Sequence, residues 1–159
     1  MSETYIQPSD DLVVSRAKRA ALPVAVGSVA LAMVQSAVGI WAGGPTGKQF
    51  GLSSLVVAGA VTTAAAVVIF GPVLRRSLAK TSQGPTALVL AILAVVFILF
   101  WWSGLPAVLA SGAVLLGYAG MNAPRGRGLS RAAVIIGVLA FAGYLASSVS
   151  DWLSTNGYI

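Results

Sequence analysis

The sequence predicts an all-α fold, that of a polytopic integral membrane protein with five transmembrane helices. Of its 159 residues, 57% are hydrophobic and 9% are charged. A soluble domain carries charged side chains at roughly a quarter of its positions, so this composition excludes a water-soluble globular protein. The mean hydropathy of +0.89 agrees. The charges gather between apolar segments, which is typical of a chain that crosses a bilayer several times.

Apolar runs and the turn residues between them set the boundaries of the expected helices. A cytoplasmic N-terminal tail with a basic interfacial segment is expected at 1–19, and a short external tail at 154–159. Pro23 falls in the first turn of the first helix, where its missing N–H does little harm. Ser130 is a suitable N-cap for the last helix. The five helices are expected at about 20–42, 52–74, 86–102, 106–121 and 131–153.

The apolar run from Thr86 to Met121 decides the number of crossings. As one helix it would be about 54 Å long, against about 30 Å for the hydrocarbon core of a bilayer. Its middle contains Ser103-Gly104-Leu105-Pro106, which supplies a helix stop, a flexible glycine and a proline suited to the start of the next helix. We therefore expect the third and fourth helices to form a tight hairpin that crosses the membrane twice.

The basic residues predict the orientation. With the N-terminus in the cytoplasm and the C-terminus outside, nine of the ten Lys and Arg residues lie in the cytoplasm and only Lys48 lies outside. This is the positive-inside bias of polytopic membrane proteins. The same topology places all four tryptophans at the outer interface, where indole side chains act as anchors. The nine bases are Arg16, Lys18, Arg19, Arg75, Arg76, Lys80, Arg125, Arg127 and Arg131, and the four anchors are Trp41, Trp101, Trp102 and Trp152.

Small and polar residues recur at helical spacing along four of the five expected helices, and such stripes let helices approach closely in a membrane. The third helix is bulky and apolar on all sides, so we expect it at the periphery, facing lipid. The stripes comprise Ser28, Ala32, Gln35, Ser36, Gly39 and Gly43; Ser54, Ala58, Thr62 and Ala65, with Gly59 and Thr63 beside them; Ala110, Ala113, Gly117 and Gly120; and Gly137, Ala140, Tyr144, Ser147, Ser148 and Asp151.

Eight polar side chains are candidates for helix packing or for contacts with a solute. Gln35 is an amide at membrane depth, and such amides more often join helices than bind ligands. Asp151 lies one turn from the end of the last helix, where a carboxylate reaches water. The hydroxyl of Tyr118 needs a hydrogen-bond partner if it is buried. The full set is Ser28, Gln35, Ser36, Thr62, Tyr118, Tyr144, Ser147 and Asp151.

The sequence lacks the parts of a catalytic or cofactor site. It contains no Cys and no His, which removes thiol chemistry, His-ligated haem and the usual zinc sites. The expected helices hold no paired carboxylates and no nucleophile next to a base, so we expect no enzyme, no catalytic residue, no metal and no cofactor. The loop Gly43–Gly51 has the wrong spacing for a phosphate-binding loop. The arginines at 125–131 are explained by orientation, so no nucleic-acid partner is expected.

These observations favour a non-catalytic accessory or structural subunit that acts by helix packing in a larger or homo-oligomeric membrane assembly. Its partners are then the lipid bilayer and other membrane subunits or further copies of itself. The alternative is a small transporter or channel for a neutral or lipophilic solute. Its path would be lined by uncharged hydrogen-bonding side chains. In either case the protein is a multi-pass protein of the cell membrane, with a bacterial inner membrane or a plasma membrane as the expected location.

Overall fold

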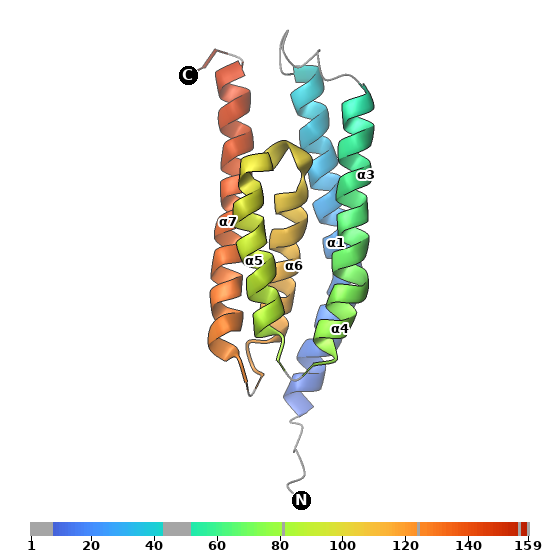
Figure 1. Cartoon of the computed structure of the whole chain (residues 1–159), viewed down its shortest axis with the longest axis vertical. Helices are drawn as coiled ribbons and strands as arrows, with labels where there is room; N and C mark the ends of the chain where they lie inside the picture. The colour runs from blue at the N-terminus through green and yellow to red at the C-terminus, as the bar shows by residue number, and fades with distance from the viewer. Residues whose placement is uncertain (1–7, 43–51, 81, 124, 156, 159) are drawn as a thin grey trace, which may run out of the picture.

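The computed structural model describes residues 8–42, 52–80, 82–123, 125–155 and 157–158, which form a bundle of antiparallel helical rods (Figure 1). These residues contain no strand, and the prediction of an all-α protein is confirmed. The elements in chain order are α1 (Pro8–Ala42), α3 (Leu52–Val68), a π-helical turn η1 (Ile69–Val73), α4 (Leu74–Leu78), α5 (Gly84–Phe97), a 3-10 turn η2 (Ile98–Ser103), α6 (Leu105–Ala119) and α7 (Arg127–Thr155).

Three of the helical rods are long and apolar enough to cross a membrane: Leu12–Val38, Leu55–Leu78 and Arg127–Ser154. The hairpin helices are shorter, since α6 has 15 residues and is about 22 Å long, against about 30 Å of hydrocarbon. Figure 1 shows the α5–α6 turn well below the upper ends of α1, α3 and α7. The hairpin itself is present, and its two crossings stay a prediction.

One end of the bundle collects most of the basic residues of the chain. The start of α1, the short helix α4 and the connection between α6 and α7 all lie at the lower end in Figure 1. These segments carry the nine bases assigned to the cytoplasm above, and we call this the basic end. Lys48 and the rest of the loop Gly43–Gly51 lie outside the described residues.

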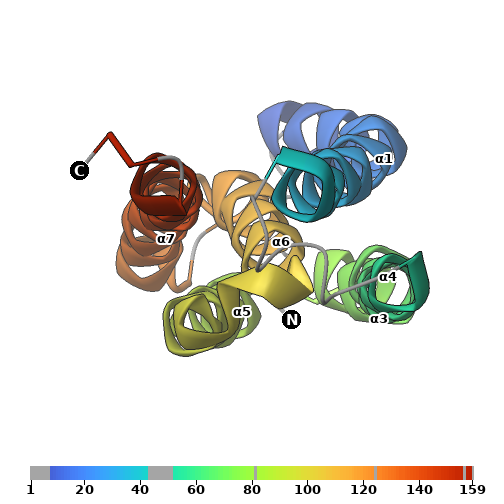
Figure 2. The ribbon, with the colours of Figure 1, turned by 90° about the horizontal axis from the view of Figure 1, so that it is seen from above.

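Helix α6 occupies the centre of the bundle, with α1, α3, α5 and α7 around it (Figure 2). Its small residues explain this position, because Ala107, Ala110 and Ala113 are completely buried. A Cβ atom on Gly117 would lie 2.9 Å from the carbonyl oxygen of Ser130 on α7. Such close approach of two backbones is the role that small residues play between helices in a membrane.

Helix α1 is longer than its sequence pattern indicates. It runs without a break for 35 residues, about 52 Å, and includes the basic segment that was expected to lie separately before the first crossing. Pro23 is therefore inside a continuous helix and not in a first turn. The apolar residues that follow Pro23 and the good helix formers that precede it support one helix on both sides of the proline.

The second rod also continues past its expected end, through the π-helical turn η1 to Leu78. Pro72 lies inside this turn and cannot donate a backbone hydrogen bond. The chain accommodates it by widening, since the Leu74 N–H reaches back five residues to the carbonyl of Ile69. A π-turn of this kind is a recognised way to place a proline within a helix.

The prediction that the third helix lacks a stripe of small residues is wrong. Ala87, Ala91 and Ala94 of α5 are completely buried, and together with Leu90 they form the face that packs on α6 and α7. Valines and isoleucines cover the opposite, exposed face. The three alanines stand within a run of larger apolar residues, so composition does not distinguish them. Their spacing of four and three residues is the pattern that indicates a shared helix face.

Helix α7 begins at Arg127, one turn before the expected start. Ser130 is therefore not the N-cap. It lies within the first turn, its N–H donates to the carbonyl of Gly126 at 3.0 Å, and its side chain is fully buried. Gly126 has a φ of 86°, a conformation that glycine adopts without strain. The chain turns sharply at this residue, so α7 can begin at Arg127.

Candidate functional site

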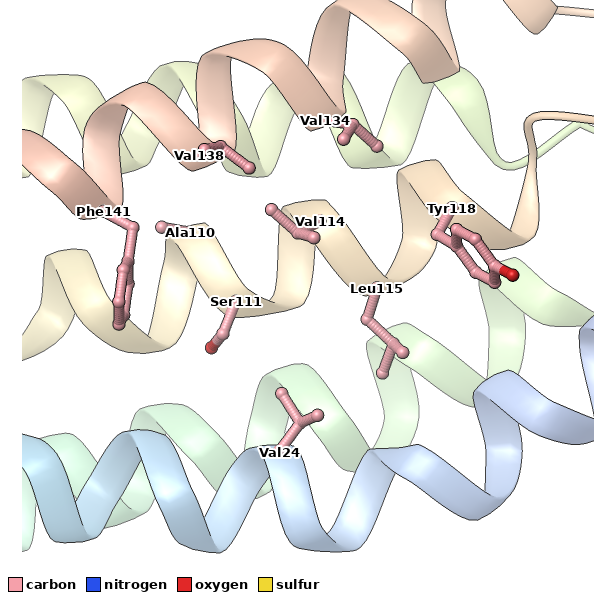
Figure 3. Close-up of a pocket in the computed structure, with 9 residues that line it drawn as sticks. All are labelled: Val24, Ala110, Ser111, Val114, Leu115, Tyr118, Val134, Val138 and Phe141. Carbon is pink, nitrogen blue, oxygen red and sulfur yellow. The ribbon is translucent and has the colours of Figure 1, made fainter.

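A groove runs along the side of the bundle between α1 and α7, with α6 as its floor (Figure 3). Its volume is about 380 Å³, which lies in the range of pockets that hold small molecules. The wall that it offers to a ligand is apolar. We call it the lateral groove, and it is lined by Val24, Ala110, Ser111, Val114, Leu115, Tyr118, Val134, Val138 and Phe141.

The lateral groove exists because α1 and α7 both pack on α6 but scarcely contact each other. On α6, the residues Ser111, Val114, Leu115 and Tyr118 follow a spacing of three and four and therefore share one face. The small residues of α6 occupy other faces and draw α5 and α7 close. The face with the larger side chains is left between two helices that do not close over it.

Tyr118 forms the end of the groove that is nearer to the basic end. Its side chain is 49% exposed, and its hydroxyl points along α6 toward the C-terminal end of that helix (Figure 3). On α7, Arg131 precedes the groove residues Val134 and Val138 by one and two turns. Helical geometry therefore places Arg131 on the groove side of α7, below the end of the apolar wall.

The arginines at the start of α7 differ in what they bind. Arg127 donates from Nε to the carbonyl of Ala123 at 3.0 Å and from Nη2 to the carbonyl of Asn122 at 3.2 Å. These two bonds tie the start of α7 to the connection that follows α6. Arg131 is exposed, and among the described residues it has no hydrogen-bond or ion-pair partner. A guanidinium carries five N–H donors that can bind an anion.

The turn between α5 and α6 is fixed to α3. Thr62 Oγ1 lies 2.8 Å from the carbonyl oxygen of Ser103 in the turn and 2.7 Å from the carbonyl oxygen of Ala58 in its own helix. Within the turn, Ser103 Oγ donates to the carbonyl of Phe100 at 2.7 Å and accepts from the Leu105 N–H at 3.3 Å. Non-helical backbone at membrane depth is tolerated where protein satisfies its polar groups, and these bonds meet that requirement.

Gly104 is the residue that brings this turn against α1 and α3. Its φ is 68°, and a Cβ atom there would lie 2.6 Å from the Cβ of Ala32 and 2.9 Å from Thr62 Oγ1. One turn beyond Ala32, both amide atoms of Gln35 are buried and have no hydrogen-bond partner among the described residues. The turn, Thr62 and this stretch of α1 thus form the most polar contact inside the bundle.

A second buried polar cluster lies at the basic end. A Cβ atom on Gly120 at the end of α6 would contact both the Ser130 hydroxyl and Gln83, the residue before α5. Gln83 Nε2 donates to the carbonyl of Lys80 at 3.0 Å. Gln83 Oε1 and Ser130 Oγ are buried without a partner in the described part of the chain. These groups join the ends of three helices and form no opening to the outside.

The other predicted site residues are dispersed. The hydroxyls of Ser28 and Ser36 donate to carbonyls of their own helix, each at 2.9 Å. Tyr144 is 1% exposed in the interior, with its ring centroid 6.4 Å from that of Phe141. Ser147 is half-buried farther along α7, and Asp151 is exposed near its end. Of the eight candidates, Tyr118 lines the lateral groove, and Thr62 and Gln35 lie near the α5–α6 turn.

Two of the four expected tryptophan anchors can be placed. The Trp102 side chain is 58% exposed next to the α5–α6 turn and meets the ring of Phe100 edge-on, at 5.5 Å between centroids. Trp152 stacks on Tyr158 at 5.7 Å near the end of α7. Both lie away from the basic end, but the turn that carries Trp102 lies below the upper end of α7 (Figure 1), so a common position at the outer interface stays a prediction. The side chains of Trp41 and Trp101 lie outside the described residues.

No known protein family, characterised protein or solved structure matches this chain. The function must therefore be argued from the geometry described above.

The lateral groove was missed from the sequence. A signal for it exists, because Ser111, Val114, Leu115 and Tyr118 form a second stripe on α6, beside the stripe of small residues. A helix with two such faces has two kinds of neighbour. The second face is either covered by a helix or left open as a groove, depending on the distance between α1 and α7. The residue pattern on α6 alone does not predict that distance.

Proposed function

We propose that the chain crosses the cell membrane five times, with its N-terminus in the cytoplasm and its C-terminus outside. The gathering of nine bases at the basic end supports this orientation through the positive-inside rule. Three rods have the length to cross, and we count the shorter α5–α6 hairpin as two further crossings because its turn points away from the basic end (Figure 1). The carbonyl of Ser103 and the N–H of Leu105 in that turn are bonded to side chains, which suits a turn close to the hydrocarbon. A bacterial inner membrane or a plasma membrane fits this arrangement.

We further propose that the protein is a non-catalytic accessory or structural subunit, which acts by helix packing in a larger or homo-oligomeric membrane assembly. The observation that carries this proposal is the outward face of α3. Ala60, Thr63 and Ala64 are exposed there, although small residues in membrane helices are enriched at contacts between helices. A lipid-facing helix has no need of such residues, whereas a docked helix does.

The contrast with the interior strengthens this point. The expected stripes on α3 and α6 are used within the bundle, since Thr62, Ala110 and Ala113 are buried. Ala60 and Ala64 lie outside the expected stripe and Thr63 lies beside it, and the described part of the chain leaves all three exposed. Gly27 on α1 is likewise exposed, with open space where its Cβ would be. Both surfaces suit a neighbouring helix.

The test is the mass of the native assembly. The full chain is purified in mild detergent, and its subunit composition is read by native mass spectrometry. The double variant Ala60→Leu/Ala64→Leu adds bulk to the outward face of α3 and is expected to dissociate the assembly. Val89→Leu on the exposed face of α5 is the matched control and is expected to leave the assembly intact.

A wild-type protein that is strictly monomeric and brings no partner with it would contradict the proposal. An assembly that survives in the double variant would also do so, because the contact would then lie elsewhere.

A transporter or channel for a neutral or lipophilic solute is less well supported. It requires Gln35, Thr62, Tyr118, Tyr144 and Ser147 to line one path, and four of them do not line the lateral groove that contains Tyr118. The groove wall extends along α6 from Ala110 to Tyr118, about 12 Å, which is less than half of the hydrocarbon thickness. It is a lateral recess and not a path across the membrane.

A further inference from the structure

The length of the lateral groove matches one leaflet of a bilayer. On α6, the groove wall extends from Ala110 to Tyr118, about 12 Å along the helix. This is a little less than half of the roughly 30 Å hydrocarbon core. The groove therefore extends from the level of the bases to about mid-depth, and then ends against Phe141 and Ala110. A docked transmembrane helix would need a groove of the full depth, whereas an acyl chain of one leaflet needs half.

The lining of the groove changes from apolar to polar toward the basic end, as a phospholipid changes from acyl chain to head group. The wall is apolar from Phe141 to Leu115, then comes the hydroxyl of Tyr118, and then the guanidinium of Arg131 on the groove side of α7. Arg127, one turn earlier, directs two of its N–H groups to carbonyls in the connection between α6 and α7. Arginine binds phosphate oxygens well because its donors form a planar fork.

We propose that the lateral groove binds one anionic phospholipid, with an acyl chain along Val138, Val114 and Val24 and its phosphate at Arg131 and the Tyr118 hydroxyl. Basic pockets between transmembrane helices on the cytoplasmic side are suited to anionic head groups. This proposal rests on the orientation proposed above, because that orientation sets the leaflet from which the lipid comes. It is independent of whether the protein forms an assembly.

The experiment measures lipid bound to the full chain. Protein in mild detergent is titrated with phosphatidylglycerol or with phosphatidylcholine of the same acyl chains, and bound lipid is counted by native mass spectrometry. The wild type is expected to retain one phosphatidylglycerol in preference to phosphatidylcholine. Arg131→Gln is expected to lower that preference about five-fold, which is the usual contribution of one cation near an anionic lipid.

Two matched controls separate this site from general attraction and from misfolding. Arg125→Gln removes an exposed base from the same connection, away from the groove wall, and is expected to leave the preference unchanged. Val138→Trp fills the groove and is expected to lower binding of both lipids, whereas Val89→Trp on the exposed face of α5 is expected to lower neither.

Equal losses in Arg131→Gln and Arg125→Gln would overturn the proposal, since the attraction would then be nonspecific. Unchanged lipid binding in Val138→Trp would overturn it as well. The subunit number in the same spectra reports separately on the assembly. If labelling places the basic end outside the cell, the assignment to the cytoplasmic leaflet fails, even if phosphatidylglycerol binds.

Discussion

The hydroxyl of Thr62, in the middle of α3, lies 2.8 Å from the backbone carbonyl of Ser103 in the turn of the α5–α6 hairpin. The two residues are 41 positions apart, and this bond joins the hairpin to a different rod of the bundle. The hydroxyl has one proton, which it can give either to Ser103 or to the carbonyl of Ala58. Since Thr62 is 1% exposed, no water replaces the bond when it is lost.

Replacing Thr62 by Val is expected to destabilise the bundle by about 0.6 to 1.7 kcal/mol, the range measured for side-chain hydrogen bonds between membrane helices. The shape of the side chain is kept, so the loss reports the hydroxyl. Thermal unfolding in detergent measures it. Thr86→Val near the start of α5 is the matched control, because the Thr86 hydroxyl makes no hydrogen bond to another described residue, and its expected effect on the unfolding temperature is small. Equal effects of the two variants would count against the role of the Thr62 bond.

Gly104→Ala is expected to destabilise the hairpin for two reasons. A non-glycine residue at a φ of 68° costs about 1–2 kcal/mol, and the new methyl group would lie too close to Ala32 and Thr62. Gly157→Ala separates the two effects, because Gly157 has a φ of 73° and open space at its Cβ position. The unfolding temperature of Gly104→Ala should fall below that of Gly157→Ala. If both fall alike, the contact with α1 and α3 contributes nothing.

Gly117→Ala is expected to separate α6 from α7. The added Cβ would lie 2.7 Å from a methyl group of Val134 and 2.9 Å from the carbonyl of Ser130, and the carbonyl belongs to a helix backbone that cannot turn aside. Overpacking of this kind costs about 1–3 kcal/mol. Gly128→Ala in the first turn of α7 should be neutral or stabilising, because alanine favours helix and nothing lies within 4 Å. Thermal unfolding of both variants in the same detergent decides the matter.

Single cysteines can report the topology, because the chain has none of its own. With a membrane-impermeant maleimide on intact cells, Trp102→Cys and Tyr158→Cys are expected to react, and Gly128→Cys only after the cells are permeabilised. Trp102 lies in the turn between α5 and α6, which does not reach the level of the upper ends of α1 and α7 (Figure 1), so its cysteine should react more slowly than that at Tyr158. No reaction at Trp102→Cys alongside a normal reaction at Tyr158→Cys would contradict the two crossings of the hairpin, because its turn would then not reach the outer surface.

The hairpin illustrates how far the sequence reaches. The residues Ser103-Gly104-Leu105-Pro106 locate the turn correctly. Glycine ends one helix and proline begins the next through local backbone preferences, which do not depend on the rest of the fold. The interior position of Pro23 was not foreseen, since residues on both sides of it favour helix and the helix continues through it. The burial of Ala87, Ala91 and Ala94 was also missed, because it depends on which face α6 and α7 approach.

The site was less accessible to sequence reasoning than the fold. Tyr118 was selected as a hydroxyl that needs a partner, but its place at the end of an apolar groove follows from the gap between α1 and α7. Gln35 and Tyr144 were selected as possible members of one path, and the structure places them on different helices away from the groove wall. Polar residue type indicates that a side chain needs a partner and does not indicate which one.

The sequence by itself determined that the protein is all-helical with segments apolar enough to cross a membrane, where the hairpin turns and which segments carry the positive charge. These properties depend on hydropathy, local turn chemistry and the cost of charge in a bilayer, all of which act over short stretches of chain. Only the tertiary structure decided that α6 lies at the centre, that Gly104 contacts Ala32 and Thr62, and that α1 and α7 leave a groove between them. These depend on the packing of side chains that are far apart in sequence, and small differences in their size decide which helices meet.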